Sequence, residues 1–240
     1  MFYYFIFCIY INMFSHYVNN SNNITITNDF YAVPFGQRCT SALACKYANI
    51  RFFSLPFDWT IPLFPGKIKK ILENNFENFI PEANVIQQNA YFNKYDIALA
   101  HFNPDTEKGI EEYKRRIDRF DYIMHDSKKK YFVYINEDYL YNNNYRDDNF
   151  NNHIFNEMLD LEYFLKEKYT NIDYNILYFN FKHHNIPENS NIINIVLHTT
   201  NVYDDEKVHA VIDFRQYCAS VLSGIFGTKL NCYLNNDNNF

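Results

Sequence analysis

Glycine is scarce in this chain, which has 5 glycines and 7 prolines among 240 residues, against 24 phenylalanines and 22 tyrosines. No glycine-rich loop of the kind that cradles nucleotide phosphates occurs. Tryptophan occurs once. One segment nevertheless gathers several rare residue types, "YAVPFGQRCTSALACKYANIRFFSLPFDW" at 31–59, with Gly36, Cys39, Cys45, Asp58 and Trp59. This segment is therefore the strongest candidate for a functional site.

The chain also lacks an excess of positive charge, because its formal net charge is −6 at pH 7 and its pI is about 5.7. The local basic run at Lys114, Arg115, Arg116 and Arg119 is offset by acidic residues around it. A groove that tracks phosphates is not indicated, and we expect no nucleic-acid partner.

Cysteine pairs with the spacing of metal ligands are missing. The five cysteines are odd in number and widely spread, and no Cys-x-x-Cys occurs. This pattern favours free thiols in a reducing compartment, so we expect a cytoplasmic protein. It also disfavours zinc, and we expect neither a metal nor an organic cofactor.

The N-terminal stretch is apolar over residues 1–14 but too short to span a membrane, and it lacks the marks of a signal peptide. Three interpretations stay open: an extension upstream of a start at Met13, an anchor that contacts a membrane, or an element packed on the domain. Residues 1–28 as a whole are predicted to be an extension, apolar and then polar. A single domain is expected over 29–232, followed by a disordered Asn-rich tail at 233–240.

Hydrophobic periodicity predicts alternating strands and helices within that domain. Strands are expected at 30–35, 131–135, 174–181 and 191–198, and helices at 40–47, 65–80, 109–124, 153–168 and 207–226. Strands that are apolar on both faces and alternate with helices are typical of a mostly parallel sheet covered on both sides. The predicted fold class is therefore α/β with three layers, and an irregular insertion at about 50–105.

Cys39 follows a glycine turn and stands at the start of the helix "TSALACKY". The helix dipole and the first-turn N–H groups favour an anion there, which predicts a lowered thiol pKa and a nearby oxyanion hole. The alternative is a small thiol packed at a helix start. Cys45, six residues later, falls on another face and is expected in the core.

A cysteine nucleophile needs a base, and two histidines follow apolar segments that could end at the site. These are His101, after "YDIALA", and His198, after "IINIVLH". Asp58 lies between Phe57 and Trp59, and is either an orienter of an imidazole or a carboxylate that braces a loop. Arg115 and Arg119 lie four apart on one helix, either as a solvated face or as a clamp for a carboxylate or phosphate.

The motifs "FGQRCTSALACKYANIRFFSLPFDW", "LAHFN" and "YKRRIDRF" followed by "KKKYFVYIN" occur in this order over roughly 31–136. The combination resembles a family described as papain-like cysteine peptidases, found in bacteria and large DNA viruses. The resemblance implies that Cys39 is a nucleophile and His101 its partner. It also implies that five residues mark the family, namely Asp58, Trp59, Arg115, Arg116 and Arg119. The turn "VPFGQRC" departs from the Ser-Leu-Gly approach of the family.

We therefore expect a peptidase-like, thiol-dependent hydrolase acting on a protein or peptide, with Cys39 as nucleophile, His101 as general base and Asp58 as orienter. Trp59 and the three arginines are predicted to bind substrate. The alternative is a binding or transferase-like α/β domain that holds a glycan, nucleotide or phosphorylated ligand through Arg115 and Arg119, with Cys39 structural. The oligomeric state is left open.

Overall fold

The computed structural model describes residues 29–82, 86–87, 90–99, 106–137, 148–197 and 208–230. The predicted extension at 1–28 and the tail at 233–240 lie outside the described residues. The main sheet contains β1 (Phe30–Pro34), β6 (Lys129–Ile135), β7 (Tyr174–Asn180) and β8 (Ile192–Val196). These strands are hydrogen-bonded in the order β1-β6-β7-β8, and all three pairings are parallel. The predicted parallel sheet is confirmed.

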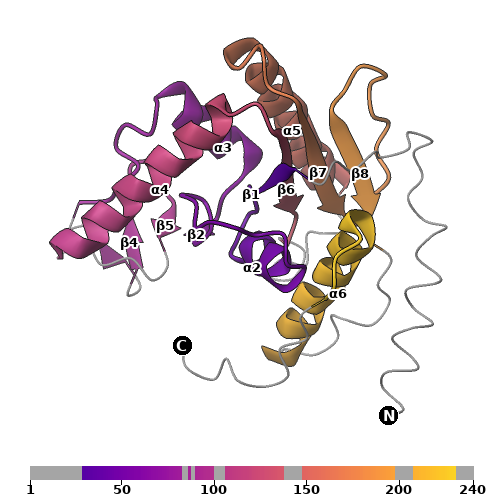
Figure 1. The fold of residues 1–240 in the computed structure, drawn as a ribbon, viewed down its shortest axis with the longest axis horizontal. Helices are drawn as coiled ribbons and strands as arrows, with labels where there is room; N and C mark the ends of the chain where they lie inside the picture. The colour runs from indigo at the N-terminus through magenta and orange to yellow at the C-terminus, as the bar shows by residue number, and fades with distance from the viewer. Residues whose placement is uncertain are drawn as a thin grey trace.

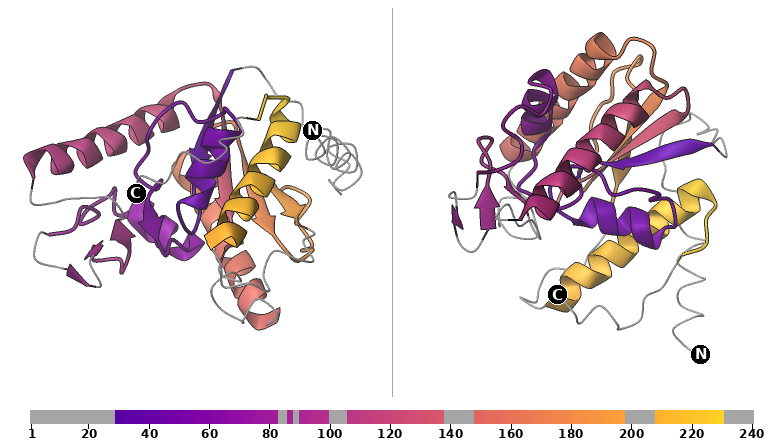
Figure 2. Two further views of the ribbon diagram at one scale, coloured as in Figure 1. Left: turned by 90° about the horizontal axis from the view of Figure 1, so that it is seen from below. Right: turned by 60° about the vertical axis from the view of Figure 1, so that its left-hand side comes forward.

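Helices cover both faces of this sheet, which makes the three layers visible in Figures 1 and 2. On one face lie α3 (Pro65–Glu73), α4 (Glu107–His125) and α5 (Asp148–Lys168). On the other, α2 (Thr40–Tyr47) packs side by side with α6 (Val208–Phe226). The predicted α/β class is therefore confirmed.

Strand β6 shows why the sequence gives a sheet buried on both sides. Its side chains alternate between the two cores, with Phe132 and Tyr134 in the core under α3, α4 and α5. Tyr131, Val133 and Ile135 enter the core under α2 and α6. Because successive strand residues point to opposite faces, a continuous apolar run fills both cores at once.

The insertion predicted as irregular contains regular structure. Besides α3, it holds a small antiparallel sheet in the order β2-β5-β4-β3, formed by β2 (Thr60–Ile61), β5 (Ala98–Leu99), β4 (Ala90–Phe92) and β3 (Ile86–Gln87). Strands of two or three residues are too short to give an alternating pattern. Helix α4 also begins earlier than predicted, at Glu107, because the Thr106 hydroxyl caps it by accepting from the Gly109 N–H at 3.1 Å.

Candidate active site at the end of the first strand

Cys39 lies where β1 gives way to α2, at the carboxyl edge of the parallel sheet. The chain leaves β1 through Phe35, whose N–H donates to the Val133 carbonyl, and turns at Gly36. A Cβ on Gly36 would stand 1.7 Å from the Ser41 hydroxyl oxygen, so only glycine fits this turn. Cys39 is the N-cap residue of α2, as the sequence predicts, and its side chain does not cap the helix.

The sulfur of Cys39 is in contact with the guanidinium of an arginine from the C-terminal helix of the domain. The Nη2 of Arg215, on α6, donates to the Cys39 Sγ at 3.2 Å. The Nε of Arg215 donates to the Thr40 hydroxyl at 3.1 Å. Since α2 and α6 pack side by side, residues 176 positions apart meet at this sulfur.

Glu137 and Gln37 complete the polar cluster beneath Cys39. The Glu137 N–H donates to the Gln37 Oε1 at 2.9 Å, and both residues are fully buried. The Glu137 carboxylate faces the hydroxyl and the backbone N–H of Thr40 and lies near Arg215. Within the described residues, the Gln37 amide nitrogen has no acceptor.

The electrostatics at Cys39 differ from the predicted lowering of its pKa. Burial raises the pKa of the Cys39 thiol, and the nearby Glu137 charge raises it further. Arg215 and Arg38 lower it, but burial is the largest single contribution and the net shift is upward. The prediction was wrong because it counted the helix terminus and left out the cost of placing a thiolate out of water. Burial likewise raises the pKa of the Glu137 carboxyl.

The two histidines predicted as the base, His101 and His198, lie outside the described residues. Among the described histidines, only His184 is buried. Its ring stacks on Phe155 with centroids 4.2 Å apart. Burial, helped by Lys182 and His183, lowers the pKa of His184 to about 4, so its ring is neutral at pH 7.

Asp58 belongs to a second, separate polar cluster. Its Oδ2 accepts from the Arg51 guanidinium and from the Leu55 N–H, the latter at 2.9 Å. Burial raises the pKa of Asp58, while Arg51 and, more weakly, Arg116 lower it. The charges that act on Cys39 are different ones, those of Arg215, Glu137 and Arg38. These contacts brace the loop that carries Asp58, and His101, which Asp58 is predicted to orient, lies outside the described residues.

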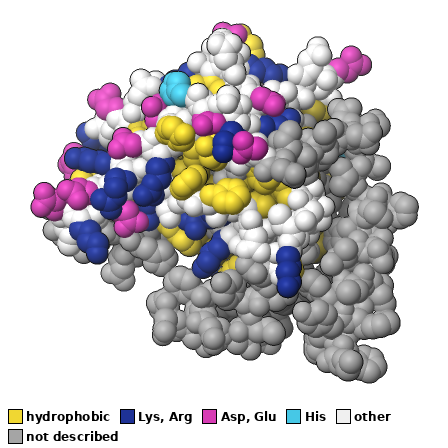
Figure 3. All heavy atoms as spheres, viewed as in Figure 1, with side chains coloured by type: hydrophobic (Ala, Val, Ile, Leu, Met, Phe, Trp, Pro, Cys, Tyr) yellow, Lys and Arg dark blue, Asp and Glu magenta, His cyan; other side chains and the backbone are white. Residues whose placement is uncertain are grey.

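Trp59, Arg116 and Arg119 lie near the Asp58 cluster, whereas Arg115 makes a pair on the surface. The Arg51 guanidinium lies over the Trp59 ring, with its central carbon 5.8 Å from the ring centroid. Arg115 pairs with Glu111 at 3.7 Å on the surface, and Arg116 pairs with Glu112 in a partly buried position. Arg119 donates to the Ser54 carbonyl at 3.3 Å. In Figure 3 the surface over α4 shows Lys and Arg side chains interspersed with Asp and Glu, as expected for a solvated face.

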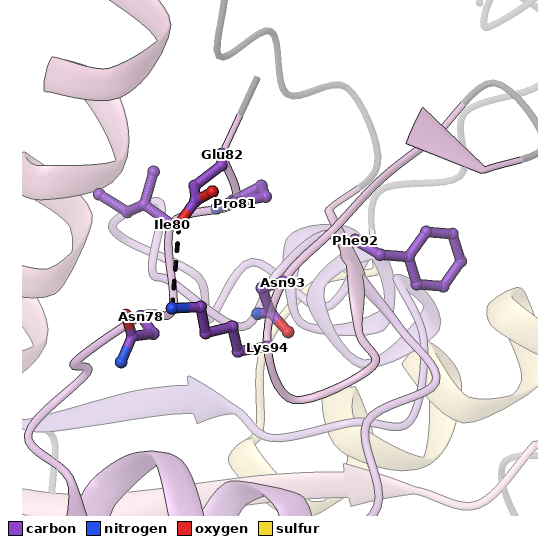
Figure 4. A pocket seen from close by; sticks show the side chains of 7 residues that line it. All are labelled: Asn78, Ile80, Pro81, Glu82, Phe92, Asn93 and Lys94. Atoms are coloured by element: carbon purple, nitrogen blue, oxygen red, sulfur yellow. Dashed lines mark ion pairs between the residues drawn. The ribbon is translucent and has the colours of Figure 1, made fainter. Parts of the chain in front are cut away.

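A pocket of about 190 Å³ lies on the insertion, and Cys39 is not among the residues that line it (Figure 4). Its lining comes from the loop after α3 and from the end of β4, and Lys94 faces Glu82 across it at 3.9 Å. None of the residues predicted for the site lines this pocket. It therefore offers no binding space for the Cys39 chemistry.

The other described cysteines are buried. Cys45 and Cys218 are free thiols with no exposed surface, and Cys45 lies in the core as predicted. Within the described ranges, no three His, Cys, Asp or Glu side chains gather as metal ligands. No helix of the described part is long and apolar enough to cross a bilayer.

Comparison with known proteins adds one finding. The model of one protein family, described as "Putative papain-like cysteine peptidase (DUF1796)", matches residues 31–184. The match includes Cys39, Asp58, Glu137 and the whole insertion, and it ends before Arg215. No curated protein and no solved structure matches the chain.

Proposed function

Because the chain belongs to the family described as "Putative papain-like cysteine peptidase (DUF1796)", we propose that it is a peptidase-like, thiol-dependent hydrolase with Cys39 as its nucleophile. The observation that carries the proposal is the setting of Cys39. Its sulfur stands at the N-terminus of α2, at the carboxyl edge of a parallel sheet, 3.2 Å from the Arg215 guanidinium. Open α/β sheets form their sites at this edge.

In the proposed reaction the Cys39 sulfur attacks an acyl carbon and gives a thioester. Because burial raises the pKa of Cys39, the resting thiol is protonated at neutral pH and must lose its proton during attack. His101, assigned through the family resemblance, accepts this proton and then passes it to the leaving group. A water molecule, deprotonated by the same histidine, hydrolyses the thioester and restores the thiol.

The start of α2 supplies a place for the negative charge of the tetrahedral intermediate. The Leu43 N–H donates to the Cys39 carbonyl at 3.0 Å and so opens the helical hydrogen-bond ladder. The backbone N–H groups of the helix residues before Leu43 have no acceptor within the helix, and the Cys39 side chain does not cap them. We assign them to the oxyanion, where one such donor contributes about 3 kcal/mol to catalysis.

A general acyl ester tests the proposal without knowledge of the natural substrate. The protein is incubated with p-nitrophenyl acetate, and the release of nitrophenol is followed. Wild-type protein should release nitrophenol in a burst followed by a steady rate, and Cys39→Ala should abolish both. Cys45→Ala is the matched control, because Cys45 is also in α2 but is buried. If Cys39→Ala retains the wild-type rate, the proposed function is wrong.

A further inference from the structure

Arg215 contacts the reacting atom of the proposed nucleophile. One edge of its guanidinium spans two neighbouring residues, since Nη2 donates to the Cys39 Sγ and Nε to the Thr40 hydroxyl. The planar fork of arginine is rigid, so two hydrogen bonds on one edge fix its orientation. A charge held in this way is already in place when negative charge develops on the sulfur.

A buried carboxylate accompanies this cation. Glu137 has no exposed surface, and its carboxylate faces the hydroxyl and the backbone N–H of Thr40. It also interacts with the charges of Arg215 and Arg38 and with the Cys39 thiol.

We propose that Arg215 is a catalytic residue that stabilises the Cys39 thiolate, and that the buried carboxylate of Glu137 limits this stabilisation by repelling the negative charge on the sulfur. This inference rests on the proposed function for its role in turnover. It adds α6 to the reaction centre, although α6 lies beyond the residues that match the family.

The chemistry assigned to Arg215 involves no proton transfer by the guanidinium. When the Cys39 S–H bond breaks, the proton goes to the general base or to solvent, and Arg215 stays protonated throughout. In the part of the chain that the structure describes, three charged groups act on the sulfur: Arg215 from α6, Glu137 after β6 and Arg38 before α2. The two cations favour the thiolate and Glu137 opposes it.

The test measures thiolate formation directly and does not depend on hydrolysis. Cys39 is labelled with iodoacetamide from mildly acidic to alkaline pH, and the label on each cysteine is quantified by peptide mass spectrometry. In this reaction the sulfur forms a bond to carbon and iodide leaves, so the rate follows the thiolate fraction. Arg215→Gln should slow labelling of Cys39 at neutral pH about three- to tenfold, and Arg215→Lys should lie between it and the wild type.

Glu137→Gln should act in the opposite direction and speed labelling at neutral pH, because it removes a negative charge near the sulfur. General loosening of the fold cannot explain slower labelling by Arg215→Gln, since exposure would relieve burial and speed the reaction. The buried Cys45 and Cys218 report on the fold in every variant, because both stay unlabelled while the cores are intact.

The proposal is overturned if Arg215→Gln labels Cys39 at the wild-type rate or faster while Cys45 and Cys218 stay protected. If Arg215→Gln exposes those thiols, Arg215→Lys is used in its place, and labelling of Cys39 at the wild-type rate or faster in that variant overturns the proposal. Wild-type or slower labelling of a folded Glu137→Gln removes Glu137 from the assignment. Failure of the proposed function has another signature, namely that Cys39→Ala leaves nitrophenol release unchanged whatever the labelling profiles show.

Discussion

Replacing Asp58 with Asn removes the charge of a side chain that is fully buried and ion-paired with Arg51. The Arg51 side chain is only 14% exposed, so it would keep a nearly buried charge without its carboxylate. Breaking one partner of a buried pair costs about 3–5 kcal/mol. The Leu55 N–H can still donate to the new amide oxygen. We therefore expect the free energy of unfolding to fall by about 3–4 kcal/mol, near the lower end of that range.

Urea unfolding followed by fluorescence measures this loss. The double variant Arg51→Met with Asp58→Asn removes both charges and should recover more than half of it. Arg115→Gln is the matched control, because its pair with Glu111 is exposed and should change stability by less than about 0.5 kcal/mol. A free energy of unfolding for Asp58→Asn within about 1 kcal/mol of the wild-type value would show that the buried ion pair does not stabilise the fold as argued. The reasoning is also refuted if the variant is stable but alters the labelling of Cys39.

Two further predictions concern the turn before Cys39 and the buried histidine. Gly36→Ala should cost about 2–4 kcal/mol in urea unfolding, because its Cβ would overlap the Ser41 side chain, whereas Gly224→Ala, with no atom within 4 Å, should be neutral or stabilising. A loss below about 1 kcal/mol for Gly36→Ala would contradict the tight turn. Stability should fall as pH falls from about 6.5 toward 4, because the unfolded chain protonates His184 while the native pKa is about 4. His184→Phe should reduce the dependence of stability on pH over this range, and His183→Phe should not. An equal pH dependence in the wild type and both variants would contradict the low pKa of His184.

The main sheet could be predicted from sequence because its strands are apolar on both faces. "KKYFVYI" and "YNILYFN" are continuous enough to indicate burial on two sides, and the helices between them show 3.6-residue periodicity. The small antiparallel sheet could not be predicted. Its strands are held by pairing with neighbours rather than by an apolar pattern, as in β5, which pairs with both β2 and β4.

For the site, the sequence predicted the position of Cys39 but not its surroundings. Glycine before a cysteine at a helix start is a local signal, and the turn at Gly36 agrees with it. Arg215 and Glu137 carry no local signal, because one lies on an amphipathic helix and the other just follows a strand. A faint clue existed for Glu137. It is an acidic residue at the carboxyl end of a buried parallel strand, where sites of this fold class form.

The pKa of Cys39 shows a second limit of sequence reasoning. A helix start predicts stabilisation of the thiolate, and Arg215 adds to it, yet burial has the larger effect and raises the pKa. Burial depends on how α2 packs against α6, which is a property of the folded chain and not of the motif. The same holds for Asp58, whose aromatic neighbours in sequence gave no sign of its pairing with Arg51.

Isolation of the acyl-enzyme tests most directly whether Cys39 is the nucleophile. The protein is mixed with p-nitrophenyl acetate, quenched in acid at short times and digested, and the peptide that carries Cys39 is examined by mass spectrometry. We expect one acetyl group on Cys39 that forms within the burst and disappears once the ester is consumed. An acetyl group on another residue, or none on Cys39 while nitrophenol is released, would contradict the assignment of Cys39 as the nucleophile.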